Sequence, residues 1–202
     1  MTKKDIKAFF KAITDGDLNK VSELLHSNKE YLTVCNIAPP KKDDGQSGLQ
    51  VAFKTGNFDI ARLLIDSGAD TDFMDASEVN EWNAPVLHDC IRATVFNSYT
   101  IQKDTNRFDK AFYLLQLMLD KHADPNSTDS YGNNCLHRAI MDSRQMIDNP
   151  GADLTNNILL PQLRKVFKVL ITAGADINLG NEKRPDAASM IKGFSLEQYQ
   201  LW

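Results

Sequence analysis

The chain has 202 residues, 42% of them hydrophobic, and a formal net charge of −4 at pH 7. This length suits one medium-sized domain or a short repeat array, and the acidic balance argues against electrostatic binding of nucleic acid. No segment approaches the roughly 18 apolar residues of a membrane span, and Lys11 and Asp15 interrupt the N-terminal stretch, so we expect a cytoplasmic protein without a membrane or nucleic-acid partner.

Apolar residues at helical spacing predict pairs of amphipathic helices along the chain. In the second helix of the second pair, Ile60, Leu63 and Leu64 recur at i, i+3 and i+4. The same pattern recurs at 21–25, 114–118 and 166–170.

A glycine follows two of these helices, at Gly68 and Gly174. Glycine adopts the left-handed conformation that ends a helix without steric cost, so we assign both a structural role in the turn. Lys29 and His122 occupy the same position after the other two helices, where the left-handed conformation would cost about 1 kcal/mol.

The spacing of these landmarks predicts a repeat. The stretch from Leu49 to Gly68 contains one helix pair, and the stretch from His122 to Leu136 leads from one pair into the next. Together the two stretches give a compact repeat of about 33 residues, a period typical of a solenoid of stacked helix pairs. A short helix pair cannot bury its apolar faces alone, which is why the pairs stack. The third and fourth repeats carry insertions between their helices, each about half as long as a compact repeat.

The segments NNCLHRAI at 133–140 and APVLHDCI at 84–91 resemble the opening of an ankyrin repeat, and DSGADTD and TAGADINLGN resemble its close. The resemblance implies an all-α solenoid of about four helix–turn–helix repeats with a partial C-terminal cap and long inter-helix insertions in repeats three and four. We expect one domain over 1–202, with repeats at about 3–43, 44–79, 80–130 and 131–181 and the partial cap at 182–202.

The chain also departs from the family pattern. Gln50 and Phe10 stand where the family has histidine, and Cys135 and Val86 stand where it has proline. We expect these departures to keep the fold and to lower its stability.

The two insertions lie in neighbouring repeats, and two arrangements are open. They either pack on one another or form independent mobile loops. The contact in the first case would involve Phe96, Tyr99, Ile101, Ile158 and Leu159.

Two histidines lie close to cysteines: His88 precedes Cys90 by two residues, and His137 follows Cys135 by two. A zinc site needs four convergent ligands, and a thiol at an apolar core position is inert. The resemblance instead implies that both histidines clamp neighbouring backbone turns. We therefore expect no catalytic residue, metal or cofactor, and a metal- or Cys/His-dependent enzyme is the third alternative for function.

The fingers, which are the extended turns that join one repeat to the next, carry the strongest sign of function. From Asp70 to Glu81 there are five acidic residues and no lysine or arginine. Aromatic residues stand within and beside this run, and tryptophan and tyrosine are enriched at binding hot spots. The alternative is that these aromatic residues pack back onto the helices and the acids are merely solvated. The partner-binding residues that we predict, on fingers and inner helices, are Asp72, Phe73, Met74, Asp75, Glu78, Glu81, Trp82, Tyr131, Asp89, Arg92, Arg138 and Asp142.

These features predict a monomeric, non-catalytic protein–protein interaction module that binds through its fingers and its concave helical face. The acidic finger favours a basic partner, because complementary charge speeds encounter. Two narrower versions remain open. One is a bacterial immunity protein that neutralises a basic toxin, since the chain loosely resembles compact ankyrin proteins of that kind. The other is an adaptor or host-directed effector.

Overall fold

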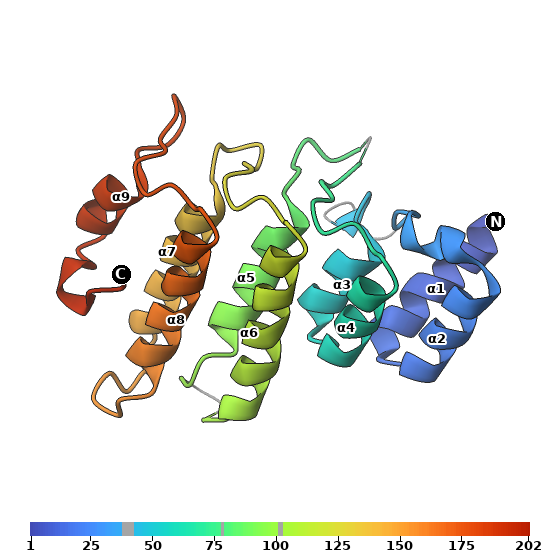
Figure 1. Ribbon diagram of the computed structural model, residues 1–202, viewed down its shortest axis with the longest axis horizontal. Coiled ribbons are helices and arrows are strands. Elements are labelled where there is room, and N and C mark those ends of the chain that lie inside the picture. The colour runs from blue at the N-terminus through green and yellow to red at the C-terminus, as the bar shows by residue number, and fades with distance from the viewer. Residues whose placement is uncertain (38–42, 78, 101–102) are drawn as a thin grey trace. The chain divides into compact units, whose positions relative to one another are not determined.

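The computed structural model describes residues 1–37, 43–77, 79–100 and 103–202 (Figure 1). Over these residues the protein is all-helical, with nine α-helices and only isolated β-bridges, which confirms the predicted all-α class. The helices are α1 (Lys3–Asp15), α2 (Leu18–Ser27), α3 (Gly48–Thr55), α4 (Phe58–Asp66), α5 (Val86–Phe96), α6 (Thr105–Asp120), α7 (Cys135–Ile147), α8 (Leu159–Thr172) and α9 (Ala187–Gly193), with 3-10 helices η1 (Lys29–Leu32) and η3 (Glu197–Tyr199).

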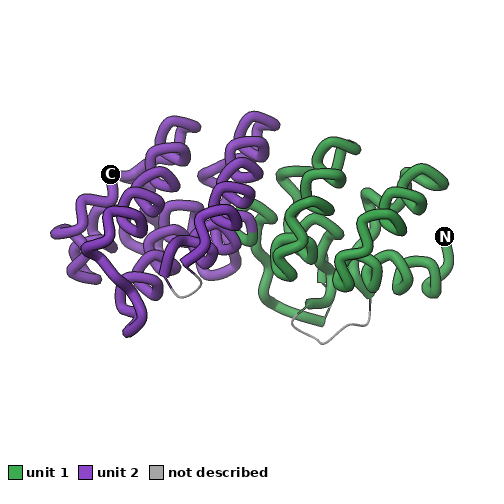
Figure 2. Tube along the Cα trace, turned by 90° about the horizontal axis from the view of Figure 1, so that it is seen from below, with its two compact units in different colours: residues 1–89 green, residues 90–202 purple. Residues whose placement is uncertain are grey.

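The chain divides into two compact units, unit 1 (Met1–Asp89) and unit 2 (Cys90–Trp202), and the division falls within α5 (Figure 2). The single domain expected over 1–202 therefore remains a prediction. Each of the four expected repeats nevertheless contains one pair of the helices that the structure describes, and α9 lies in the expected cap. None of the described helices combines the length and the apolar character that crossing a membrane requires.

Unit 1 contains two helical hairpins, α1–α2 and α3–α4 (Figure 1). Gly16 and Gly56 end α1 and α3 in the left-handed conformation, with φ of 75° and 70°, so the chain reverses within two residues. α1 packs on α3 and α2 packs on α4, so that first helices form one layer and second helices the other. The side chain of Asn57 joins the hairpins, because its Nδ2 donates a hydrogen bond to the carbonyl of Ile13 at 2.7 Å.

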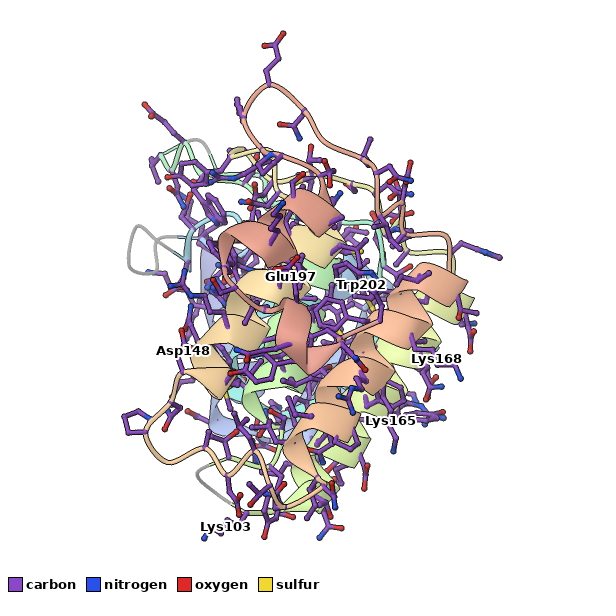
Figure 3. All side chains as sticks on the ribbon, turned by 90° about the vertical axis from the view of Figure 1, so that its left-hand side faces the viewer. Lys103, Asp148, Lys165, Lys168, Glu197 and Trp202 are labelled. Atoms are coloured by element: carbon purple, nitrogen blue, oxygen red, sulfur yellow. The ribbon has the colours of Figure 1, made fainter. Side chains whose placement is uncertain are left out.

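Unit 2 contains the remaining pair α7–α8, the helix α6, which packs on α8, and the helix α9, which packs on α7. Its core includes the fully buried rings of Phe108 and Phe167. The C-terminal segment covers α8: Arg164 donates hydrogen bonds to the carbonyls of Tyr199 and Gln200 at 2.8 and 3.0 Å. The ring of Trp202, which is labelled in Figure 3, lies 5.4 Å from that of Phe167.

The two predicted insertions meet in unit 2. The backbone N–H of Tyr99 donates a hydrogen bond to Oε1 of Gln162, in the first turns of α8, at 2.7 Å. Leu159 is fully buried, but Phe96 is 41% exposed and is not buried by this contact. Ile101 lies outside the described residues.

The helix ends follow the glycine pattern at three of the four positions. Gly68, His122 and Gly174 all have left-handed backbones, with φ of 96°, 67° and 99°. Lys29 does not, because Asn28, the residue that follows α2, is extended and Lys29 begins η1. The strain that we expected at Lys29 is therefore absent, whereas His122 keeps the conformation that carries it.

Candidate functional site

Finger 2, residues 70–85, is a short hairpin at the end of unit 1. Met74 and Pro85 form an antiparallel bridge, and the N–H of Val86 donates a hydrogen bond to the carbonyl of Phe73 at 2.9 Å. These bonds tie the two arms of the finger to the start of α5, so its base has a defined backbone.

Finger 2 is also joined to the preceding finger. The N–H of Ala76 donates to the carbonyl of Gly45 at 3.0 Å, and Oγ of Ser77 donates to a carboxylate oxygen of Asp44 at 2.8 Å. A Cβ at position 45 would lie 2.2 Å from the backbone nitrogen of Ser77, so only glycine allows this approach. The described parts of the two fingers thus support each other within unit 1.

The acidic residues of finger 2 have different environments. Asp72 and Glu81 are exposed, and Asp70 accepts a hydrogen bond from the N–H of Asp72 at 2.9 Å, which shapes the turn. Asp75 is only 8% exposed, and burial raises the pKa of its carboxyl. Its side chain is not part of the accessible surface on which we expected it, because it packs beside Gln50. Glu78 lies outside the described residues.

The aromatic side chains of finger 2 are half-buried. Phe73 lines a small cavity together with Tyr31, Leu49 and Leu64, so part of its ring packs against the helices of unit 1. Met74 and Trp82 are also half-buried. Among its described residues, finger 2 therefore presents three exposed carboxylates, those of Asp70, Asp72 and Glu81, beside partly accessible apolar groups.

Finger 3, residues 123–134 in unit 2, presents a more exposed aromatic residue. Tyr131 is 56% exposed. Its N–H and that of Asn133 both donate to Oδ1 of Asp129, each at 2.9 Å. Gly132 has φ of 79°, and a Cβ there would lie 2.6 Å from Oδ1 of Asn181.

Finger 4, residues 175–186, supports finger 3 through three side chains. Asn181 donates to the carbonyl of Gly132 at 2.8 Å, and Nζ of Lys183 donates to the carbonyl of Ser130 at 2.9 Å. Arg184 donates to Oδ1 of Asn133 at 2.7 Å. The exposed ring of Tyr131 thus stands on a backbone fixed by hydrogen bonds from the next finger.

The predicted residues of the inner helices form an ion cluster in unit 2 rather than a uniform surface. Asp142 is 0% exposed and lies between two arginines, with Oδ2 3.3 Å from Nε of Arg138 and Oδ1 3.5 Å from Nη2 of Arg92. Burial raises the pKa of its carboxyl, and the two guanidinium groups oppose that shift. Asp142 is therefore an interior residue, not the surface residue that we expected. In unit 1, Asp89 accepts a hydrogen bond from Gln50 at 3.1 Å.

His137 is fully buried, and both of its ring nitrogens are engaged. Nδ1 accepts a hydrogen bond from the N–H of Asn134 at 3.1 Å, so the neutral ring carries its proton on Nε2 and donates it to the carbonyl of Pro185 at 2.8 Å. Burial lowers the pKa of His137 and raises that of the adjacent thiol of Cys135. A neutral ring with both nitrogens bonded joins backbone segments and leaves no lone pair for a metal. His88, in the first turn of α5, is also buried.

Gln50 is a residue whose role the sequence analysis missed, since it was treated as a departure from the histidine pattern. Its Oε1 accepts a hydrogen bond from the N–H of Ser47 at 3.0 Å, and its Nε2 reaches the carbonyl of Ala84 at 3.4 Å. Ser47 in turn accepts from the N–H of Gln50 at 3.2 Å, which completes a capping box. The Ser-x-x-Gln spacing at the start of a helix is the signal that would have revealed it.

Within the described ranges, no three histidine, cysteine, aspartate or glutamate side chains converge as metal ligands would. Comparison of the sequence with protein-family models and with curated proteins finds no match.

Proposed function

We propose that this chain is an ankyrin-type solenoid whose function is the non-catalytic binding of a protein partner through its fingers. The helix pairs, the hairpin at the base of finger 2 and the left-handed helix ends support the fold assignment. The observation that carries the function is the exposed ring of Tyr131 on a finger that its neighbour holds in place.

This geometry suits binding because the finger is already ordered in the free protein. An exposed loop normally loses conformational freedom when it binds, and a loop fixed beforehand loses less. Tyrosine offers a large apolar ring with a polar hydroxyl and is enriched among hot-spot residues. The N–H of Tyr131 donates to Asp129, and the side chain of Asn181 donates to the carbonyl of Gly132, so the backbone at Tyr131 and at the next residue is held in place.

Finger 2 supplies the electrostatic part of the proposal. Asp70, Asp72 and Glu81 are exposed, and no lysine or arginine stands between positions 70 and 81. Such a patch attracts a basic surface and accelerates encounter. The narrower version of the function, an inhibitor that neutralises a basic toxin, rests on this patch.

The test is capture of the partner from a native lysate, followed by titration of the identified partner with the wild-type protein and with Tyr131→Ala. We expect the substitution to weaken binding by about 2 kcal/mol, or roughly thirtyfold, because it removes a hot-spot ring. Tyr113→Ala is the matched control, since Tyr113 is 45% exposed but lies on α6. Equal affinities of the two variants, or a lower melting temperature of Tyr131→Ala with unchanged affinity, would contradict the proposal.

The inhibitor version has its own measurement. If the captured partner is a basic toxin, its activity should be lost in the complex, and Asp72→Lys should slow association most strongly at low salt. A partner that keeps its full activity in the complex would leave an adaptor role instead.

A further inference from the structure

Residues 196–202 form a strap on α8, and a single side chain of that helix holds the backbone of the strap. Nε of Arg164 donates a hydrogen bond to the carbonyl of Gln200 at 3.0 Å, and Nη2 donates to the carbonyl of Tyr199 at 2.8 Å. Among the described residues, no other hydrogen bond joins the strap to α8. A substitution of Arg164 would therefore remove these polar contacts together.

Apolar side chains anchor the strap in unit 2. Leu196 and Leu201 are only 2% and 3% exposed. The ring of Trp202 lies 5.4 Å from that of Phe167, which is fully buried on α8. Figure 3 labels Glu197 and Trp202, which both belong to the strap. The site on α8 thus fits a segment that presents two leucines, a tryptophan and two backbone carbonyls in a fixed order.

The strap leaves α9 through a strained residue. Ser195 is exposed and has φ of 56°, in the left-handed region that disfavours L-residues with a side chain. Its N–H donates to the carbonyl of Lys192 at 3.0 Å, and the N–H of Leu196 donates to the carbonyl of Ile191 at 3.0 Å. These bonds form the tight turn that directs the strap back onto α8 of the same molecule. An extended Ser195 would lose this strain and would direct the strap away.

We propose that the strap exchanges between two copies of this chain, so that the strap of each copy occupies the α8 site of the other. A second copy suits the site because its strap presents the same side chains and carbonyls in the same order. The contacts at the site are then identical in the monomer and in the dimer, as in other domain-swapped proteins. Seven extended residues span about 23 Å, which allows the strap to reach a neighbouring molecule. The dimer also relieves the strain at Ser195.

The monomer expected from the sequence is the closed form at low protein concentration. A segment on a short linker has an effective concentration in the millimolar range at its own site, so the wild type should exchange straps only as the protein approaches about 1 mM. The hinge at Ser195 controls this balance. Ser195→Pro excludes the left-handed conformation and removes the N–H that bonds to Lys192, and it leaves the strap and α8 unchanged. Ser195→Gly is the matched control, because glycine adopts the closed turn without strain.

The test is sedimentation of the full-length chain between about 10 µM and about 1 mM. We expect Ser195→Pro to form dimers at concentrations at least about tenfold lower than the wild type, and Ser195→Gly to stay monomeric. Adding Arg164→Gln to Ser195→Pro should restore the monomer, since the strap then lacks its hydrogen bonds at the site of either copy. An excess of the peptide SLEQYQLW, residues 195–202, should dissociate the dimer because it fills the same site.

Several results would overturn the inference. A Ser195→Pro variant that is still monomeric at about 1 mM would exclude exchange between copies, even if it binds the peptide. Equal dimerisation of the proline and glycine variants, or a dimer that survives the peptide, would mean that another surface joins the copies. A protein that binds the proline variant but not the glycine variant would be the occupant instead.

Two controls keep these outcomes distinct. Ser195 is exposed, so its substitutions leave the core intact, and thermal unfolding of both variants verifies this. Tyr131→Ala should leave self-association unchanged, because Tyr131 lies on finger 3 and has no part in the strap. Failure of this inference and failure of the finger proposal can therefore be told apart.

Discussion

Unit 1 and unit 2 have different side chains at the same position of a helix, and both side chains make the same kind of hydrogen bonds to the backbone. Gln50 is the third residue of α3 and His137 is the third residue of α7. Each accepts a hydrogen bond from the backbone N–H of its N-cap residue, at 3.0 and 3.1 Å, and each reaches a backbone carbonyl at the end of the next finger. The position therefore requires one acceptor and one donor at a fixed separation, and an amide or an imidazole can supply them.

The difference between the units is that only one of these side chains titrates. The amide of Gln50 is neutral at every accessible pH. Protonation of His137 would place a proton on Nδ1, opposite the N–H of Asn134, and would replace an attraction with a repulsion. Burial accordingly lowers the pKa of His137. The hydrogen bonds of His137 in unit 2 are therefore sensitive to acid, whereas the corresponding hydrogen bonds of Gln50 in unit 1 are not.

The largest expected effect comes from removing the side chain of His137 or of Gln50. His137→Ala leaves the N–H of Asn134 and the carbonyl of Pro185 without their partner and opens a cavity at a fully buried position, so we expect it to destabilise unit 2 by about 3 kcal/mol. Gln50→Ala should destabilise unit 1 by about 2 kcal/mol, because its bond to the carbonyl is longer. Urea unfolding measures both.

The chain provides a separate probe for each unit in that experiment. Its two tryptophans are Trp82 in unit 1 and Trp202 in unit 2. Trp202→Phe leaves fluorescence that reports on unit 1, and Trp82→Phe leaves fluorescence that reports on unit 2. If His137→Ala shifts both signals equally, the units unfold together. A shift below about 0.5 kcal/mol in the Trp202 signal of unit 2 would rule out the clamp of His137.

The second test is the pH dependence of stability. The unfolded chain has an ordinary histidine pKa near 6.5 at position 137, and the folded pKa is lower. Between the two values the unfolded state binds one more proton, so this contribution to stability is complete above pH 6.5 and falls as the pH drops toward the folded pKa. The slope reaches about 1.4 kcal/mol per pH unit.

Exchanging the two side chains isolates this effect. His137→Gln should flatten the pH dependence of unfolding between about pH 7 and 5.5, and Gln50→His should make it steeper. The exposed histidines, His26 and His122, are present in both variants and cancel in the comparison. Identical pH profiles for wild type and His137→Gln would mean that another group controls the acid response.

The parts of the structure that sequence could predict are those set by local pattern. The i, i+3, i+4 spacing of Ile60, Leu63 and Leu64 predicts a helix whatever surrounds it, and α4 spans these residues. The burial of Asp142 was not predictable in the same way, because it depends on Arg92, which lies on a different helix far away in the sequence. The clamp of Gln50 lies between these cases: its capping box is local, but its bond to Ala84 depends on the path of finger 2.

The smallest effect concerns the helix ends, where the two units again differ at one position. Gly68 ends α4 with φ of 96°, whereas His122 ends α6 with φ of 67°, in the region that disfavours side chains. His122→Gly should therefore stabilise unit 2 by about 1 kcal/mol, since it removes that cost and outweighs the added freedom of the unfolded chain. Gly68→Ala should destabilise unit 1 by a similar amount. A Cβ at this position would meet nothing within 4 Å, so any loss of stability would come from backbone strain alone. Trp202 fluorescence gives the unfolding midpoint for His122→Gly, and Trp82 fluorescence gives the midpoint for Gly68→Ala. If His122→Gly is destabilised instead, the contacts of the imidazole contribute more stability than the left-handed backbone costs.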